Sequence, residues 1–285
     1  MNLSDINVVK ELLSANGFTF SKGLGQNFLV DDSVCPRLAQ SAGLDENTAV
    51  IEIGAGIGVL TAQLAQRAGK VISFELDRRL LPVLARTLEG FDNIELVNAD
   101  IMKADLFKLI EERCAGMRVC VCANLPYYIT SPVIMLLLES RLPVESVTVM
   151  VQSEAAQRLC AQVGTRDGGA VTVAIAYYAN AQRLFFVPRD SFLPAPKVDS
   201  EVIQLKIRKE PPVALTDEKM FFRVVKAAFA QRRKTAVNSV SATLGVPKEQ
   251  IAQILTECNL DLNIRAERMT MQAFAAVSER LTAAK

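Results

Sequence analysis

The sequence predicts an α/β fold followed by a small all-helical domain. Short apolar runs rich in β-branched residues recur at residues 49–53, 71–75, 94–97, 119–123 and 147–151. Segments with helical spacing, such as 60–67 and 80–88, separate these runs. Strands that alternate with helices in this way are typical of a mostly parallel sheet with helices on its faces.

The pattern continues beyond the glycine pair at 168–169. It predicts a helix at 170–178, a strand at 183–187, a proline-rich loop at 188–196 and a strand at 202–207. We expect this short pairing to close the sheet with an antiparallel edge.

Pro211 and Pro212 then interrupt the backbone, and only helical patterns follow them. These patterns cover residues 217–230, 235–244, 248–257 and 271–283. We therefore place a domain boundary near residue 210. The first 30 residues precede the first core strand, with a helix predicted at 4–15 and a turn-rich segment at 21–29, and we expect them to form an appended lid.

Composition excludes several kinds of site. The 285-residue chain has no histidine, which removes the commonest general base and the commonest metal ligand. Its six cysteines lie in apolar stretches without a Cys-x-x-Cys pair, so we expect reduced core thiols and no bound metal. Half of the residues are apolar, yet no run of about 18 apolar residues and no secretory signal pattern appears, so we expect a cytosolic protein without a membrane segment.

The glycines that follow the first core strand predict a nucleotide-like ligand. Gly54, Gly56 and Gly58 stand between the strand and a helical stretch that begins at Val59, and such a turn lets the backbone approach a ligand closely. A dinucleotide-binding motif would need its third glycine at position 59. The Gly-x-Gly-x-Gly spacing therefore favours S-adenosylmethionine over NAD, although a tight turn alone also explains the glycines.

Acidic residues end the next two strands. Glu75 follows the glycines by about 20 residues, where a carboxylate accepts hydrogen bonds from ribose hydroxyls, and Asp77 is a weaker candidate for this role. Asp100 ends the third strand and is a candidate acceptor for the exocyclic amine of the cofactor's adenine. Each acid alone is more often a helix cap or a surface group. Together they indicate one ligand at the carboxyl edge of the sheet.

The segment Asn124-Leu125-Pro126-Tyr127 follows the fourth strand and resembles the catalytic motif of adenine-N6 methyltransferases. Together with the segment 25–29, it resembles the ribosomal RNA adenine dimethyltransferase family. Segments 192–200, 229–235 and 265–267 resemble the bacterial small-subunit (16S) branch of that family. The resemblance covers nearly the whole chain and implies a Rossmann-like class I methyltransferase fold with a mostly parallel seven-stranded sheet.

The chemistry of this segment needs no strong base. The Asn124 side-chain oxygen and the backbone carbonyl of Leu125 or Pro126 can accept both hydrogens of an adenine amine and hold its nitrogen in line with the methyl group. The sulfonium is already activated, so positioning supplies most of the catalysis. Tyr127 is a candidate platform for the flipped adenine, whereas core packing is as good an explanation for Tyr128.

The resemblance adds further site residues. It implies that Phe192 is the second aromatic residue at the acceptor base, and its proline-rich surroundings predict a loop outside the core. It also implies that Gln26, Asn27 and Leu29 meet the methionine end of S-adenosylmethionine, although Gly-x-Gln-Asn alone is a weak pattern. With Gly54, Gly56, Glu75, Asp100 and Asn124, they complete the predicted cofactor-binding residues.

A basic cluster predicts an RNA-binding surface in the C-terminal part. The formal net charge is only +1, so nucleic-acid binding requires local clustering. Arg223, Lys226, Arg232, Arg233 and Lys234 lie within 12 residues and alternate with phenylalanines, so a helix can bury the rings and present the cations. A solvated helix face is the alternative interpretation.

The resemblance supplies the target and the partner. It implies that two adjacent adenines in the 3'-terminal hairpin loop of small-subunit rRNA are each methylated twice, late in 30S ribosome biogenesis. We accordingly expect an S-adenosylmethionine-binding catalytic domain at 1–210, a helical RNA-binding domain at 211–285, the 30S particle as partner and a monomeric protein.

Three alternatives remain open from the sequence. A macrolide-resistance methyltransferase of large-subunit rRNA shares the glycine and Asn-Leu-Pro-Tyr motifs, but segments 196–200 and 231–234 argue against it. A non-enzymatic ribosome assembly factor would not need Glu75, Asp100, Asn124 and Tyr127 together. A DNA adenine methyltransferase would need a sequence-reading element, and the sequence indicates none.

Overall fold

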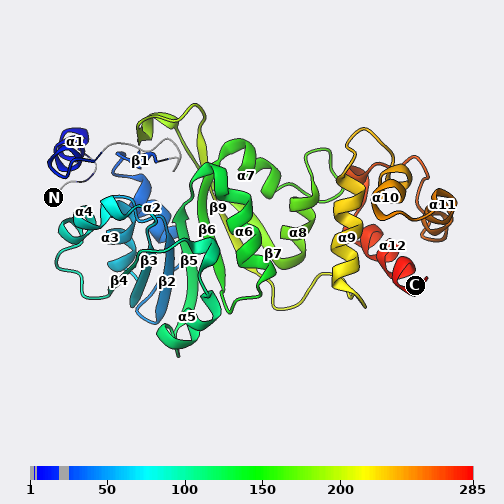
Figure 1. The fold of residues 1–285 in the computed structure, drawn as a ribbon, viewed down its shortest axis with the longest axis horizontal. Helices are drawn as coiled ribbons and strands as arrows, with labels where there is room; N and C mark the ends of the chain where they lie inside the picture. The colour runs from blue at the N-terminus through cyan, green and yellow to red at the C-terminus, as the bar shows by residue number, and fades with distance from the viewer. Residues whose placement is uncertain (1–2, 4, 19–25, 285) are drawn as a thin grey trace. The chain divides into compact units, whose positions relative to one another are not determined.

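The predicted alternation of strands and helices is present in the structure, a computed structural model that describes residues 3, 5–18 and 26–284. Seven strands form one sheet in the order β4-β3-β2-β5-β6-β9-β7 (Figure 1). They are β2 (Thr48–Ile53), β3 (Lys70–Phe74), β4 (Ile94–Val97), β5 (Arg118–Asn124), β6 (Ser146–Gln152), β7 (Ala179–Val187) and β9 (Ser200–Ile207). Five neighbouring strands of the sheet, β4, β3, β2, β5 and β6, are parallel to one another. β9 runs antiparallel to β6. The class I methyltransferase fold expected from the sequence is confirmed.

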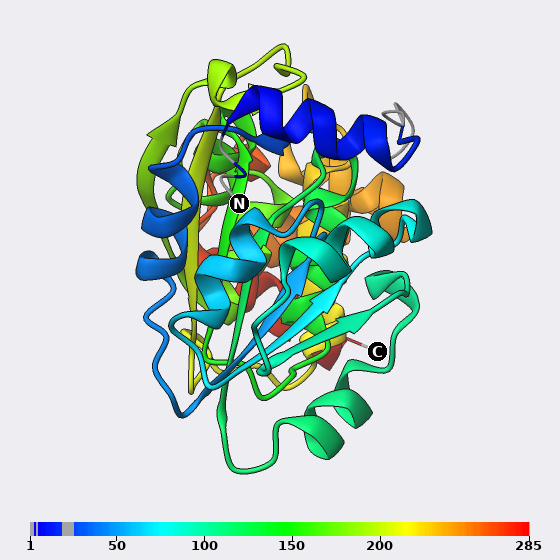
Figure 2. The same cartoon turned by 90° about the vertical axis from the view of Figure 1, so that its left-hand side faces the viewer.

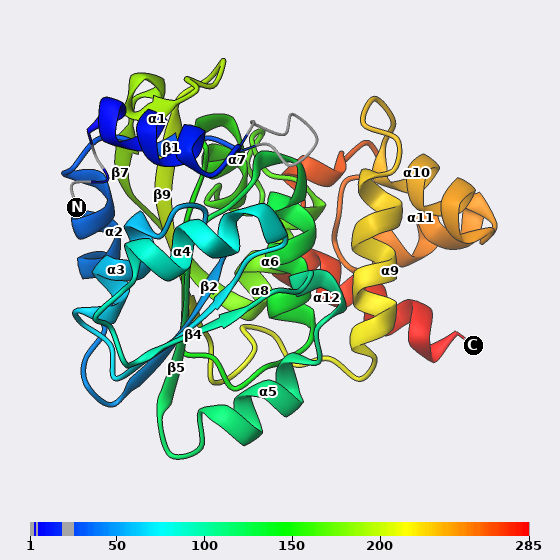
Figure 3. The same ribbon diagram turned by 60° about the vertical axis from the view of Figure 1, so that its left-hand side comes forward.

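Helices cover the two faces of this sheet. They are α2 (Val34–Ser41), α3 (Val59–Ala65), α4 (Leu81–Thr87), α5 (Leu106–Arg113) and α6 (Thr130–Glu139), and α7 (Ser153–Leu159) follows β6. Leu38 of α2 and Leu64 of α3 pack in one core cluster with Val50 of β2 and Met150 of β6. Figures 2 and 3 show α2 and α5 on opposite sides of the sheet. Every residue of β2 is buried, as expected for a central strand covered on both faces.

The N-terminal helix α1 (Ile6–Ala15) begins after Asp5, whose side chain accepts a hydrogen bond from the Asn7 backbone N–H at 2.8 Å. Its apolar side chains, among them Leu12 and Leu13, pack with Ile57 and Leu84, and Figure 3 shows α1 beside α4. The predicted turn-rich segment lies outside the described residues at positions 21–25. From residue 26 the chain continues into the short strand β1 (Phe28–Leu29).

β1 pairs antiparallel with a second short strand, β8 (Phe192–Leu193). This pairing places Phe192 in a strand and in the core, whereas its proline-rich surroundings predicted a loop outside the core. Phe192 lies opposite Leu29, is only 4% exposed and belongs to the same core cluster as Cys35. The expectation was wrong because local sequence gives no sign of a partner strand more than 160 residues away.

A second unit comprises residues 157–180 and 208–284, while the described residues up to 156 form the first unit together with 181–207. Its helices are α8 (Ala170–Tyr178), α9 (Glu218–Phe229), α10 (Ala236–Leu244), α11 (Lys248–Glu257) and α12 (Met271–Ala283). Asp217 caps α9, and Gly245 ends α10 at a φ of 69°. The assignment of 1–210 and 211–285 as functional domains stays a prediction, since the structural division does not test function.

α8 packs against α9 through aromatic rings within the second unit. The ring centroids of Tyr178 and Phe222 are 5.4 Å apart and stacked, and those of Tyr177 and Phe221 are also 5.4 Å apart. The Tyr178 hydroxyl donates a hydrogen bond to Glu218 at 2.9 Å. These contacts explain why residues 157–180 group with the C-terminal helices.

The six cysteines are all free thiols. Four are buried, whereas Cys160 and Cys258 are partly exposed, so the expectation of core thiols was wrong for these two. In the part of the chain that the structure describes, no helix has both the length and the apolar character needed to cross a membrane.

Candidate cofactor and acceptor site

The turn between β2 and α3 has a backbone that only glycine adopts readily. Gly54, Gly56 and Gly58 have φ values of 84°, 60° and 89°. A Cβ atom on Gly58 would lie 2.9 Å from the Thr87 hydroxyl oxygen, and one on Gly56 would lie 3.4 Å from the Phe28 ring. The turn therefore needs glycine both for its conformation and for close packing, and it leaves backbone exposed toward the end of the sheet.

Glu75 follows β3 and is hydrogen-bonded at both of its carboxylate oxygens. Oε2 accepts from the Gly56 backbone N–H at 2.9 Å, and Oε1 accepts from the Asp77 backbone N–H at 2.8 Å. Burial raises the pKa of Glu75 above its ordinary value, and backbone hydrogen bonds from Asp77, Gly56 and Leu76 oppose this effect. A carboxylate has about four acceptor positions, so Glu75 is oriented by its backbone donors but not saturated.

Asp77 is not one of the residues that line the same pocket as Glu75. Its Oδ2 accepts a hydrogen bond from Gln26 Nε2 at 2.9 Å and from Arg79 Nη2 at 2.6 Å, while its Oδ1 accepts from Arg79 Nε at 2.8 Å. The hydrogen bonds from Arg79 are the largest cause that lowers the pKa of Asp77 to about 2. Asp77 is thus an ionised anchor for the segment that contains Gln26.

Asp100 caps the short 3-10 helix Ile101–Lys103, because its side chain accepts a hydrogen bond from the Met102 backbone N–H at 3.0 Å. Capping is the ordinary role of such a residue. Asp100 nevertheless lines the same pocket as Glu75.

The segment after β5 has a defined geometry. Asn124 is the last residue of β5, and the Leu125 backbone N–H donates to the Met150 carbonyl at 3.2 Å. The Pro126 carbonyl already accepts hydrogen bonds from the Ile129 backbone N–H at 3.1 Å and from the Thr130 hydroxyl at 3.3 Å. This carbonyl therefore has both of its acceptor positions in use.

The two tyrosines of this segment differ. The Tyr127 hydroxyl forms a 2.7 Å hydrogen bond with the Ser200 hydroxyl, and burial raises the pKa of Tyr127. Tyr128 is 55% exposed, so core packing does not explain it. Both rings line the pocket.

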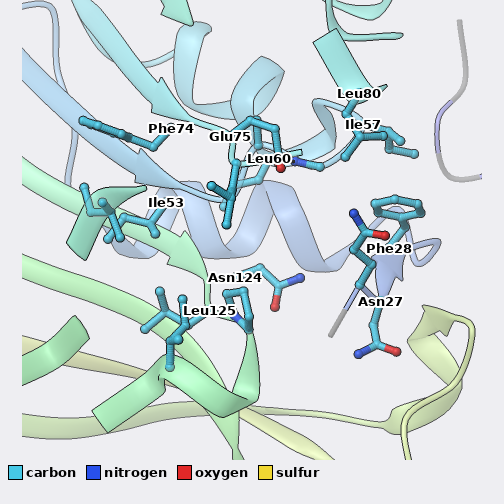
Figure 4. A pocket seen from close by; sticks show the side chains of 18 of the residues that line it. Asn27, Phe28, Ile53, Ile57, Leu60, Phe74, Glu75, Leu80, Asn124 and Leu125 are labelled. Carbon is cyan, nitrogen blue, oxygen red and sulfur yellow. Dashed lines mark hydrogen bonds between the residues drawn. The ribbon is translucent and has the colours of Figure 1, made fainter. Parts of the chain in front are cut away.

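One pocket gathers the predicted cofactor and acceptor residues. Its lining contains Gln26, Asn27, Leu29, Gly54, Gly56, Glu75, Asp100, Asn124, Leu125, Pro126, Tyr127 and Phe192. Glu75 and Asn124 lie at the ends of β3 and β5, the two strands that flank β2, and Figure 4 shows Asn27 and Phe28 across from them. Segments that are far apart in the sequence thus meet at the carboxyl ends of the parallel strands.

Several lining residues were not predicted from the sequence. Phe28 lies inside the Gln-Asn-Phe-Leu segment, and Leu76 and Met102 follow the acids Glu75 and Asp100. Leu76 is 48% exposed and Met102 is 38% exposed. A large apolar residue one or two positions after a site acid is the signal that could have identified Leu76 and Met102.

The basic cluster belongs to the second unit. Arg223 and Lys226 are exposed on α9, and Arg232, Arg233 and Lys234 are exposed between α9 and α10. Phe221 is fully buried, while Phe222 and Phe229 are half-buried. The helix therefore buries its rings and presents its cations, as the spacing predicts, although RNA binding itself stays a prediction.

The parallel sheet, the glycine turn and the Asn124 segment define a class I methyltransferase. The family model for ribosomal RNA adenine dimethylase matches residues 17–283. The chain belongs to the ribosomal RNA adenine dimethylase family.

Individual relatives agree with this assignment. The chain is 49% identical over 276 residues to "Ribosomal RNA small subunit methyltransferase A" of Geobacillus sp. (strain WCH70), with 95% of each chain covered. It is 44% identical to the protein of the same name from Streptococcus gordonii, with 99% of this chain and 98% of the relative covered.

Solved structures share the fold. The crystal structure of 23S rRNA methyltransferase ErmE matches with a TM-score of 0.69 and 28% identity, covering 90% of this chain and all of that one. A dimethyladenosine transferase from Plasmodium falciparum matches with a TM-score of 0.74 and 24% identity, over 88% of this chain and 95% of that one, which shows the fold alone.

Proposed function

We propose that this chain is an S-adenosylmethionine-dependent enzyme that dimethylates the N6 amines of two adjacent adenines in the 3'-terminal hairpin loop of 16S rRNA. Family membership supports adenine dimethylation of ribosomal RNA. The names of relatives that are 44–49% identical support the small subunit as the target. The observation that carries the proposal is the Asn124 segment, which lines one pocket together with Glu75 and Asp100.

The pocket residues fit S-adenosylmethionine. The Glu75 carboxylate keeps acceptor capacity beyond its backbone hydrogen bonds, which suits the hydroxyls of a ribose. Asp100 is assigned to the adenine amine, and Gln26, Asn27 and Leu29 to the methionine end. The bound cofactor supplies a methyl group on a positively charged sulfur that leaves as a neutral thioether.

The chain positions the acceptor amine between two oxygens. Asn124 Oδ1 accepts one amine hydrogen. The Leu125 carbonyl is the better second acceptor, because the Pro126 carbonyl is already used by Ile129 and Thr130. These two oxygens hold the nitrogen lone pair toward the methyl group, so that orientation contributes most of the rate.

Aromatic rings complete the acceptor site. We assign Tyr127 as the stacking platform for the flipped adenine, held in place by its hydrogen bond to Ser200. Phe192 is assigned to the opposite side of the base. Its burial beside β1 gives this ring a rigid support that an isolated loop residue would lack.

The exposed cations of the second unit are assigned to the phosphate backbone of the rRNA. Arg223, Lys226, Arg232, Arg233 and Lys234 are suited to this role because guanidinium and ammonium groups bind phosphate oxygens without reading base sequence. Base selection then depends on the pocket.

The most direct experiment incubates undermethylated 30S particles with the protein and methyl-labelled S-adenosylmethionine. The expected product is N6,N6-dimethyladenosine in 16S rRNA. Absence of product from folded protein that binds the cofactor would contradict the proposal. Product in 23S rRNA alone would favour the large-subunit enzyme, and tight 30S binding without methylation would favour an assembly factor.

A further inference from the structure

Hydrogen bonds link the N-terminal wall of the pocket to the glycine turn. Gln26 Nε2 donates to Asp77 Oδ2 at 2.9 Å. The Asp77 backbone N–H donates to Glu75 Oε1 at 2.8 Å, and the Gly56 backbone N–H donates to Glu75 Oε2 at 2.9 Å. Asp77 thus contacts two pocket residues, Gln26 and Glu75, without lining the pocket itself.

Asp77 is itself held firmly. The Arg79 backbone N–H donates to Asp77 Oδ1 at 3.1 Å, which fixes the turn after β3 and aims the Asp77 N–H at Glu75. The Arg79 guanidinium binds both carboxylate oxygens and lies 5.0 Å from the Phe18 ring centroid. Phe18 in turn contacts Phe28, with ring centroids 6.0 Å apart.

We propose that Asp77 is a positioning residue for cofactor binding, which holds the Gln26 side of the pocket and the Glu75 carboxylate in a fixed relation. This inference rests on the proposed function, in which Glu75 binds the ribose and Gln26 lies at the methionine end of the same cofactor. A ligand that contacts both ends binds more tightly when both are held in place beforehand. Asp77 supplies that preorganisation through its side chain on one end and its backbone N–H on the other.

The burial of the Asp77 side chain indicates that Asp77 does more than form a surface ion pair with Arg79. The Asp77 side chain is 5% exposed, whereas the Arg79 side chain is 48% exposed. A pair with one half-exposed partner adds little to stability. The low pKa of Asp77 keeps its carboxylate ionised at neutral pH, so it remains a hydrogen-bond acceptor for Gln26 Nε2.

The test measures binding of S-adenosylmethionine and S-adenosylhomocysteine to the full chain without RNA, by calorimetry and by stopped-flow dissociation. Asp77→Ala is expected to raise both dissociation constants about tenfold, mainly through faster dissociation, which corresponds to about 1.4 kcal/mol. Asp77→Asn keeps the size of the side chain and remains measurable if the alanine variant does not fold. Asp105→Asn is the matched control, since Asp105 caps α5 through a 3.1 Å hydrogen bond from the Lys108 backbone N–H and does not line the pocket.

A double-mutant cycle tests the path through Gln26. If Gln26 acts through Asp77, the variant with both Gln26→Ala and Asp77→Ala loses less affinity than the sum of the two single losses. Unchanged dissociation rates in folded Asp77 variants, or strictly additive losses, would overturn the inference. Failure of the wild-type protein to bind S-adenosylmethionine would instead overturn the proposed function, so the two failures are distinguishable.

Discussion

At the scale of single residues, Glu52 is the most unusual group in the described chain. It is fully buried in β2, and its Oε2 accepts hydrogen bonds from the Thr61 hydroxyl at 2.7 Å and the Ser73 hydroxyl at 2.5 Å. Its Oε1 has no hydrogen-bond partner among the described residues. Burial raises the pKa of Glu52 from 4.5 to about 7. The negative charge of the nearby Glu75 also raises this pKa, whereas the hydrogen bonds from Thr61 and Ser73 lower it.

This pKa predicts a pH-dependent stability. Between pH 4.5 and 7 Glu52 is ionised in the unfolded chain but keeps its proton in the folded chain. The contribution of protonated Glu52 to the free energy of unfolding is therefore fully present below pH 4.5 and is lost as the pH rises through 7. The free energy of unfolding should fall by about 3 kcal/mol over this interval on account of Glu52. Urea titrations across this range test it. Glu52→Gln should remove this part of the pH slope, and an unchanged slope in that variant would contradict the account.

Asn124 carries the central catalytic assignment. Asn124→Ala removes one of the two oxygens that orient the acceptor amine, so methyl transfer to 30S particles should fall by about 100-fold or more. Binding of 30S particles should change little, because phosphate contacts are assigned to the second unit. Single-turnover methyl transfer and filter binding measure the two quantities. Transfer at near wild-type rate would refute the assignment.

At the scale of elements, the sequence predicts most of the fold because its strands and helices are long enough to show periodicity. The bounds predicted for α8, α11, α12 and β4 are those observed. The two-residue strands β1 and β8 were missed, since two residues show no period and their partners lie far apart in sequence. The acids Glu75 and Asp100 were found from their places at strand ends. The Gly56 N–H that orients Glu75 was not predicted, because this contact depends on how the glycine turn packs beside the end of β3.

The glycine turn gives a prediction at this scale. Gly58→Ala should lower the free energy of unfolding by about 1–3 kcal/mol, because a Cβ atom would combine the strain of a φ of 89° with a 2.9 Å contact to the Thr87 hydroxyl. Gly90→Ala is the matched control. Its φ is 95°, but a Cβ atom there has no neighbour within 4 Å. Chemical denaturation of the two variants separates the effect of the Thr87 contact from the effect of backbone strain. Equal losses in the free energy of unfolding for Gly58→Ala and Gly90→Ala would contradict the role assigned to the Thr87 contact.

At the scale of the whole molecule, the pocket and the basic cluster belong to different units of the chain. The sequence predicts both sets of residues, since a motif and a charge cluster are local features. The grouping of residues 157–180 with the C-terminal helices was not predicted, because it depends on aromatic packing between α8 and α9.

The separation of the two units predicts separable functions. Replacing Arg232, Arg233 and Lys234 together by alanine should weaken 30S binding and reduce its dependence on salt, because binding through fewer phosphate contacts releases fewer counterions. The affinity for S-adenosylmethionine should stay unchanged, since none of the three lines the pocket. Binding titrations at several salt concentrations test this. An unchanged salt slope would show that these cations do not contact RNA.

The measurement that tests the account most directly is the identity of the methylated nucleotide. Undermethylated 30S particles are treated with the protein and S-adenosylmethionine, and fragments of the 16S rRNA are analysed by mass spectrometry. We expect two adjacent N6,N6-dimethyladenosines in the 3'-terminal hairpin loop, and about 100-fold less of them, or still less, with Asn124→Ala after the same reaction time. Methylation at any other nucleotide, or at a ring nitrogen of adenine, would contradict this expectation.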